Sequence, residues 1–147
     1  MSMPINVMAQ ETQKSKTINL LEGAEITVYD ANGNIVEHHA PNEKFDIASG
    51  VNIPSLGFVE VGVDFWYNGG TMTFYASMSN GRVQDCFIHM VSVSSSRYYS
   101  LGDFVAINGN WYGKAVKSSG GVSGYYNAKI YNGNSNMVRL DSLTAIE

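Results

Sequence analysis

The chain has 147 residues, of which 44% are hydrophobic and 15% are charged. It can therefore form the core of one ordinary domain, and its composition is not that of a disordered segment. The formal net charge is −4, and no run of Lys or Arg occurs. Nucleic acids and anionic membranes require clustered basic residues, so we expect no nucleic acid and no membrane among the partners.

The N-terminal segment is polar. Residues 1–8 have neither the basic nor the apolar region of a secretory signal, and no apolar run approaches the roughly 20 residues that cross a bilayer. These features predict a cytoplasmic protein, a virion component or a fragment of a larger exported protein. Residues 1–17 are predicted to form a flexible arm, and residues 18–147 a single β domain.

Asn-Gly dipeptides mark most of the predicted turns of the chain, and helical periodicity is almost absent. Asn-Gly is a strong hairpin signal because a type I′ turn needs a positive φ at both central residues. Serial hairpins predict an all-β, antiparallel, jelly-roll-like sandwich of about eight to ten strands. Two tandem small SH3-like barrels are the alternative. The five dipeptides begin at Asn32, Asn68, Asn80, Asn108 and Asn132.

The central dipeptide allows a register to be predicted. With Asn68-Gly69 as a two-residue turn, one face of the hairpin collects apolar pairs, as a sheet with one buried face requires. Those pairs are Phe65–Met72, Val63–Phe74, Val61–Ala76 and Val59–Met78. The other face collects Trp66–Thr71, Asp64–Thr73, Gly62–Tyr75 and Glu60–Ser77. A turn at Asn80-Gly81 would extend this hairpin into a three-stranded meander over residues 58–93.

Three further hairpins and one buried strand complete the predicted elements. Residues 86–91 are apolar on both faces, which favours a central or doubly covered strand. The three hairpins pair residues 25–30 with 35–39, 104–107 with 110–116, and 125–131 with 136–140.

The acidic residues do not predict catalysis. Glu60 and Asp64 share a strand face, but four strand residues separate their Cα atoms by about 13 Å. Glycosidases need carboxyl groups about 5–9.5 Å apart. Longer-range pairings stay open for Asp30, Asp46, Asp85 and Asp103.

The cysteine and histidines do not predict a reactive or metal-binding site. Cys86 is the only cysteine, so we expect a buried thiol, with His89 on the opposite face of the same strand. His38 and His39 are adjacent and point to opposite faces, which does not match a zinc spacing. Neither an enzyme activity nor a metal or cofactor is predicted.

Aromatic residues are the main candidates for function: nine Tyr, six Phe and two Trp. In the predicted register Trp66 and Tyr75 lie on the polar face, where an indole beside carboxylates and hydroxyls suits a sugar. Alternatively, a second sheet or another subunit covers Trp66. Trp111 is expected on a more apolar side, with Gly113 and Ala115. The predicted ligand-binding residues are Trp66, Tyr75, Asp64, Thr73, Tyr98, Tyr99, Tyr125 and Tyr126, the last four because adjacent tyrosines cannot both point into one core.

Short stretches resemble known binding modules. Residues 26–33 (ITVYDANG) resemble the opening of S-layer-type wall-binding repeats, and residues 137–143 (MVRLDSL) are similar to the closing strand and 3₁₀ turn of bacterial SH3-like wall-binding modules. The long predicted meander resembles the β-sandwich heads of phage tail or receptor-binding proteins. These resemblances imply binding of a cell-surface polymer without catalysis.

Two functions follow as hypotheses. The first is a non-enzymatic module that recognises a bacterial surface glycan or wall polymer, in a phage particle or a wall-associated protein. The second is a structural or assembly protein, a virion or homo-oligomer component, in which the arm and the same aromatic residues form an interface with other subunits.

Overall fold

The computed structural model describes residues 16–43 and 50–147, in which twelve strands and the 3₁₀ turn η2 at Val83–Asp85 are seen. No helix of these residues is long and apolar enough to cross a membrane. The strands are β1 (Thr17–Asn19), β2 (Glu25–Tyr29), β3 (Ile35–His39), β4 (Val51–Ile53), β5 (Phe58–Tyr67), β6 (Met72–Ser79), β7 (Cys86–Ser92), β8 (Tyr98–Asp103), β9 (Val105–Asn108), β10 (Tyr112–Lys117), β11 (Gly124–Asn132) and β12 (Val138–Ile146).

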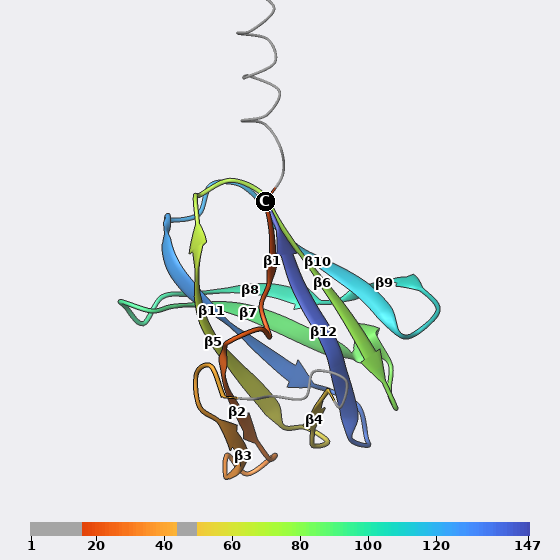
Figure 1. Cartoon of the computed structure of the whole chain (residues 1–147). Helices are drawn as coiled ribbons and strands as arrows, with labels where there is room; N and C mark the ends of the chain where they lie inside the picture. Colours follow the sequence, from red (N-terminus) through yellow and green to blue (C-terminus); the bar gives the residue numbers. More distant parts are fainter. Residues whose placement is uncertain (1–15, 44–49) are drawn as a thin grey trace, which may run out of the picture.

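The strands form two antiparallel sheets that pack face to face (Figure 1). Sheet A has the order β1-β12-β6-β10-β9. β4 pairs with the first residues of β12, whereas β1 pairs with its last residues. Sheet B has the order β3-β2-β5-β11-β7-β8. Alternate residues of both sheets point inward and form one core. Phe65 of sheet B and Phe74 of sheet A meet there edge to face, with ring centroids 5.7 Å apart. The predicted all-β sandwich is confirmed, with twelve strands in the described residues where about eight to ten were predicted.

The alternative of two tandem barrels is wrong, because each sheet combines strands from both halves of the chain. The first described strand lies beside the last, with Thr17 opposite Ile146 (Figure 1). Of the predicted arm, residues 1–15 lie outside the described residues, and Thr17 is already part of a strand.

Two of the five Asn-Gly dipeptides form the predicted hairpins. β2 pairs with β3 across Asn32-Gly33, and β9 pairs with β10 across Asn108-Gly109. In the first turn the Asp30 carboxylate accepts hydrogen bonds from the backbone N–H groups of Asn32 and Asn34, each at 2.9 Å. Both glycines have a positive φ, as turns of this kind need.

The predicted central hairpin is wrong, and so is the meander over residues 58–93. β5 belongs to sheet B, whereas β6 belongs to sheet A, so the segment at Asn68-Gly69 crosses from one sheet to the other. β5 pairs with β2 and β11, and β6 pairs with β12 and β10. The alternation of apolar residues was assigned correctly, because both strands bury the expected face. However, these buried faces oppose each other across the core and do not lie side by side.

The remaining two dipeptides are also crossings. The chain passes from sheet A to sheet B at Asn80-Gly81 and back to sheet A at Asn132-Gly133, so β11 and β12 do not pair as predicted. Asn132 is only 2% exposed, and its side chain hydrogen-bonds to Ile53, before β5, and to Asn134 and Asn136, before β12. A Cβ on Gly133 would lie 2.4 Å from the Asp85 carbonyl oxygen, so this crossing requires glycine for space.

Cys86 is fully buried on the inner side of β7, as predicted, and burial raises the pKa of its thiol to about 11. We expect iodoacetamide to label this thiol in the native protein at least about a hundredfold more slowly than in urea, because each unit of pKa lowers the thiolate fraction tenfold. Mass spectrometry over time measures both rates. Equal rates in buffer and in urea would contradict the burial of the thiol.

Candidate ligand-binding face

Sheet B carries a row of aromatic residues on its outer face. Pairing places Tyr29 opposite Phe58, Phe58 opposite Tyr131, and Tyr131 opposite Phe87. These four side chains, here called the aromatic row, cross four adjacent strands: β2, β5, β11 and β7. Residues directly opposite on one face are the closest cross-strand neighbours, so the strand register alone brings the rings together.

The rings of the aromatic row form a continuous apolar surface. Tyr29 stacks on Phe58 with centroids 4.4 Å apart, and Tyr131 stacks on Phe87 at 4.5 Å, with an angle of only 10° between their planes. Phe58 and Tyr131 join the two stacks at 5.3 Å. Each of the four residues is half-buried, because the neighbouring rings cover part of each one.

His89 and Tyr98 extend the row to the edge of the sheet. The imidazole of His89 lies 5.0 Å from the ring of Tyr131 and stacks on Tyr98 at the same distance. Burial, and then the positive charge of Lys129, lower the pKa of His89. The ring is therefore neutral at neutral pH, which suits it to an apolar surface. The aromatic row together with His89 and Tyr98 is called the aromatic band below.

Polar side chains line the next row of the same face. Thr27, Glu60, Lys129 and His89 lie opposite one another on β2, β5, β11 and β7. The Lys129 ammonium sits 4.3 Å from the centroid of Phe58, a cation–π distance. Burial, and then the charge of Glu60, raise the pKa of the Tyr29 phenol, so its hydroxyl stays a hydrogen-bond donor.

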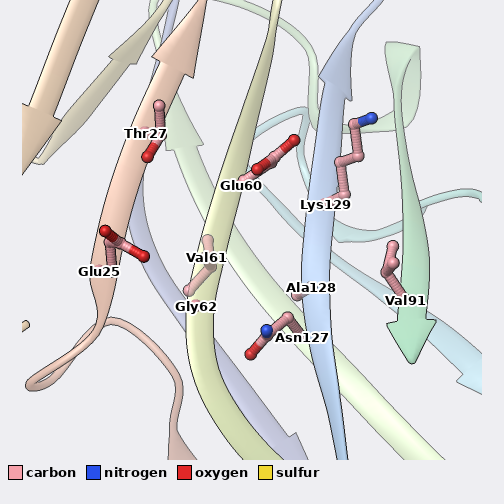
Figure 2. Close-up of a pocket in the computed structure, with 9 residues that line it drawn as sticks. All are labelled: Glu25, Thr27, Glu60, Val61, Gly62, Val91, Asn127, Ala128 and Lys129. Carbon is pink, nitrogen blue, oxygen red and sulfur yellow. The ribbon is translucent and has the colours of Figure 1, made fainter. Parts of the chain in front are cut away.

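A depression of about 210 Å³ opens beside this polar row. Figure 2 shows Glu25, Glu60, Asn127 and Lys129 around it, with Gly62 on β5 between them. Since Gly62 has no side chain, the surface there stays low. The other residues that line the depression are Thr27, Val61, Val91 and Ala128.

A β-bulge in β5 shapes the depression. Tyr126 pairs with Phe65 and Ala128 with Val61, so β5 has two more residues than β11 over this stretch. The Asn127 amide oxygen accepts a hydrogen bond of 2.6 Å from the backbone N–H of Asp64, whose φ is +53°. Bulges often lie next to functional sites, where they redirect side chains.

A second aromatic contact lies beyond the depression. Trp66 and Tyr125 are opposite each other on β5 and β11, with rings edge to face and centroids 5.0 Å apart. Trp66 is 43% exposed and Tyr125 56% exposed. We call these two residues the Trp66 pair. The second sheet does not cover them, because both side chains are exposed on the outer face of sheet B. Cover of Trp66 by another subunit stays a prediction.

The structure brings four of the eight predicted residues to this face. Three of them lie on the outer face of sheet B at the end away from the aromatic row: Trp66, Tyr125 and Asp64. The fourth, Tyr98, lies in the aromatic band.

The other four predicted residues are elsewhere. Tyr75 and Thr73 point outward from sheet A, on the opposite side of the sandwich, because β5 and β6 do not pair. Tyr126 is 1% exposed and donates its hydroxyl hydrogen bond to the Val122 carbonyl; Tyr99 also points inward and packs against the core. The expectation that Tyr126 is accessible to a ligand is corrected. Only one ring of each adjacent tyrosine pair, Tyr98 and Tyr125, faces solvent.

Sequence reasoning missed the four residues of the aromatic row. The signal was present in residues 86–91, which are apolar on both faces. This pattern was interpreted as a central or doubly covered strand. β7 is a central strand, between β11 and β8, but its outer face is not covered by a second layer, and the outward Phe87 and His89 form part of the band. Phe58 and Tyr131 come from strands far apart in the sequence, so only the pairing of β5 with β11 places them together.

The described residues contain no cluster of three or more His, Cys, Asp or Glu side chains that could hold a metal ion. His38 and His39 instead contact carboxylates, His38 with Glu25 at 3.1 Å and His39 with Glu37 at 2.8 Å. The aromatic band and the polar row beside it offer ring stacking with flanking hydrogen bonds.

Comparison with known proteins finds similarity in fold. In sequence, the chain matches neither a protein family nor a curated protein. A mutant of a family 29 carbohydrate-binding module in complex with cellulohexaose has a TM-score of 0.54 and 9% identity, over 91% of this chain and 92% of that one. This similarity shows a shared β-sandwich fold.

Two further carbohydrate-binding modules match more distantly. The low-affinity xylan-binding module CBM86 from Roseburia intestinalis has a TM-score of 0.48 and 9% identity, over 91% of this chain and 95% of that one. A module of Cellvibrio mixtus lichenase 5A in complex with cellotriose has a TM-score of 0.36 and 9% identity, over 90% and 96% of the two chains.

Proposed function

We propose that this protein is a non-enzymatic glycan-binding module and that the outer face of sheet B is its binding face. The observation that carries the proposal is the aromatic row, four rings in register across four strands. Sugars present C–H groups that pack on aromatic rings, while their hydroxyls hydrogen-bond to nearby polar groups. Glu60, Asn127 and Thr27 supply such groups beside the row.

The layout of the face favours a linear glycan. The aromatic band lies at one end, the polar depression in the middle and the Trp66 pair at the other end. Tyr131 and Tyr125 are six residues apart on β11, which corresponds to about 20 Å. A chain of several sugar units would span this distance. The binding of cellulohexaose by a neighbour of the same fold supports the choice of a linear polysaccharide.

The direct test is affinity electrophoresis of the protein through gels containing soluble cellulose derivatives or xylan, with pull-down on insoluble cellulose and on purified peptidoglycan. We expect at least one polysaccharide to retard the protein, and Phe58→Ala to remove the retardation because it interrupts the aromatic row. Equal mobility of wild type and variant in every gel, with no pull-down, would refute the proposal.

The Trp66 pair allows a prediction about ligand length. If one glycan chain spans the face, Trp66→Ala weakens binding of a long oligosaccharide by about tenfold or more, the effect of losing one exposed aromatic contact. A short oligosaccharide held only by the aromatic band keeps its affinity. Isothermal titration with cellohexaose and cellobiose, or the xylan equivalents, measures the difference. An equal loss for both lengths would contradict a ligand that follows β11.

The peptidoglycan arm of the pull-down tests the narrower prediction that the glycan is a bacterial surface or wall polymer. Retention on peptidoglycan with no retardation by cellulose or xylan supports it. The prediction of a phage particle component is tested separately, by whether an antibody against this chain labels purified particles of a phage that encodes it.

The alternative function is assembly with other copies of the chain. The feature that favours it is strand β9 at the edge of sheet A, where Val105 and Ile107 are both exposed, since an exposed edge strand can pair with another chain. Light scattering after size exclusion measures the mass of the full chain and of a variant lacking residues 1–15. A multimer that Val105→Lys converts to a monomer would support assembly through β9, whereas a monomer at all concentrations would contradict it.

A further inference from the structure

We propose that the outer face of sheet A carries a second glycan-binding site, formed by Tyr75, Tyr112 and Trp111. The site lies on the opposite side of the sandwich from the aromatic band. The proposal rests on the proposed function only in the class of ligand that it assigns. The ligand we assign to it is a neutral glycan. The two sites together would make the module bivalent.

The rings of this second site lie next to one another. Tyr112 lies opposite Ser77, and Lys114 opposite Tyr75, so Tyr75 and Tyr112 are diagonal neighbours on β6 and β10. Their rings are 6.0 Å apart and only 16° from parallel. The indole of Trp111 lies 5.4 Å from the ring of Tyr112, at an angle of 35°, and is 50% exposed.

The backbone fixes Trp111 in this position. Its carbonyl oxygen accepts a hydrogen bond of 2.7 Å from the N–H of Met78 on β6. A Cβ on Gly109, in the turn between β9 and β10, would lie 3.3 Å from the indole Cδ1. The ring therefore lies against the turn, and this contact restricts its movement before any ligand binds, which lowers the entropy cost of binding. The expected placement of Trp111 with Gly113 and Ala115 is wrong, because those two residues are buried.

Hydroxyl groups surround the rings. Thr144 lies opposite Tyr75, and Ser142 lies opposite Ser77, with a hydrogen bond between the two serine hydroxyls. Thr73 is the next outward residue of β6. Near the far end of β12 the charge of Arg139 is paired with Asp141 at 2.6 Å. Lys114, which is exposed and lies opposite Tyr75, adds an ammonium that can donate hydrogen bonds to sugar hydroxyls. Rings flanked by hydroxyls and this one donor are suited to a neutral sugar.

Two sites on opposite faces would let one module bridge two glycan chains. Neither site can reach the ligand of the other, because the core of the sandwich separates them (Figure 1). Bridging raises the apparent affinity for a dense polysaccharide surface by a hundredfold or so without any new contact. A soluble polysaccharide would instead be cross-linked into scattering particles.

The test is the stoichiometry of oligosaccharide binding, measured by isothermal titration of the full chain with cellohexaose and with xylohexaose. We expect two sites per chain. The Trp111→Ala, Tyr112→Ala double variant should lose one site, and Tyr131→Ala should lose the other. Tyr112→Phe, which keeps the ring, and Val116→Ala, on the same face, serve as controls that keep both sites.

The outcomes separate this proposal from the proposed function. A single site that Tyr131→Ala removes would overturn the second site alone. A single site that only the Trp111, Tyr112 variant removes would overturn the face of sheet B instead. If neither oligosaccharide binds, both the second site and the sheet B face are overturned as glycan-binding sites. Turbidity with soluble xylan or a cellulose derivative is a second measurement, since wild type should scatter and each single-face variant should not. A multimer that becomes monomeric on Trp111→Ala would show that this face binds a second copy and would also overturn the site.

Discussion

Replacing Tyr131 with alanine is expected to weaken glycan binding at the sheet B face more than any other single change. The ring of Tyr131 contacts Phe58, Phe87 and His89, so its loss opens the middle of the aromatic row and leaves its neighbours free to move. Central, well-packed aromatic residues contribute about 2 kcal/mol or more to binding, which is about a thirtyfold loss of affinity. Isothermal titration with the oligosaccharide that retards the protein most measures the loss.

Tyr131→Phe is the matched control for this prediction. It keeps the ring and its stacking on Phe87, so we expect affinity within about threefold of wild type, less than the effect of one typical hydrogen bond. A thermal melt of each variant shows whether the fold is retained. If the alanine variant melts like wild type and binds equally well, the aromatic row is not the binding surface.

Replacing Asn132 with aspartate is expected to destabilise the fold more than any surface change. The Asn132 amide Nδ2 donates hydrogen bonds to the carbonyl oxygens of Ile53, Pro54 and Asn136, at 3.0, 3.1 and 3.1 Å. Its Oδ1 accepts from the backbone N–H of Asn134 at 2.8 Å. Aspartate would place a buried carboxylate oxygen against three carbonyl oxygens, at a cost of about 3–5 kcal/mol. Urea denaturation measures the change in the free energy of unfolding.

Asn136→Asp is the control for the second prediction. This side chain is exposed and donates one hydrogen bond, of 2.9 Å, to the carbonyl oxygen of Asn80. We expect a loss within about 1 kcal/mol, as for an exposed hydrogen bond. If Asn132→Asp costs no more than this control, the Asn132 hydrogen bonds do not hold the crossing between β11 and β12.

Local patterns were sufficient for most of the secondary structure, although β1, β4 and β8 were not predicted. Alternation of apolar residues showed which side chains of β5 and β6 are buried, since a strand has a strict period of two residues. The turn chemistry of Asn32-Gly33 and Asn108-Gly109 was sufficient for two hairpins. The burial of Cys86 opposite an outward His89 also followed from strand alternation.

By itself, the sequence determined an all-β chain, the inward face of most strands and the aromatic character of the exposed residues. Only the tertiary structure decided which strands are neighbours. A strand that buries one face satisfies the same apolar pattern whether the next strand lies beside it or across the core, so Asn68-Gly69 is compatible with either arrangement. The aromatic row depends on this choice, because its rings come from β2, β5, β7 and β11 and meet only through the order of sheet B.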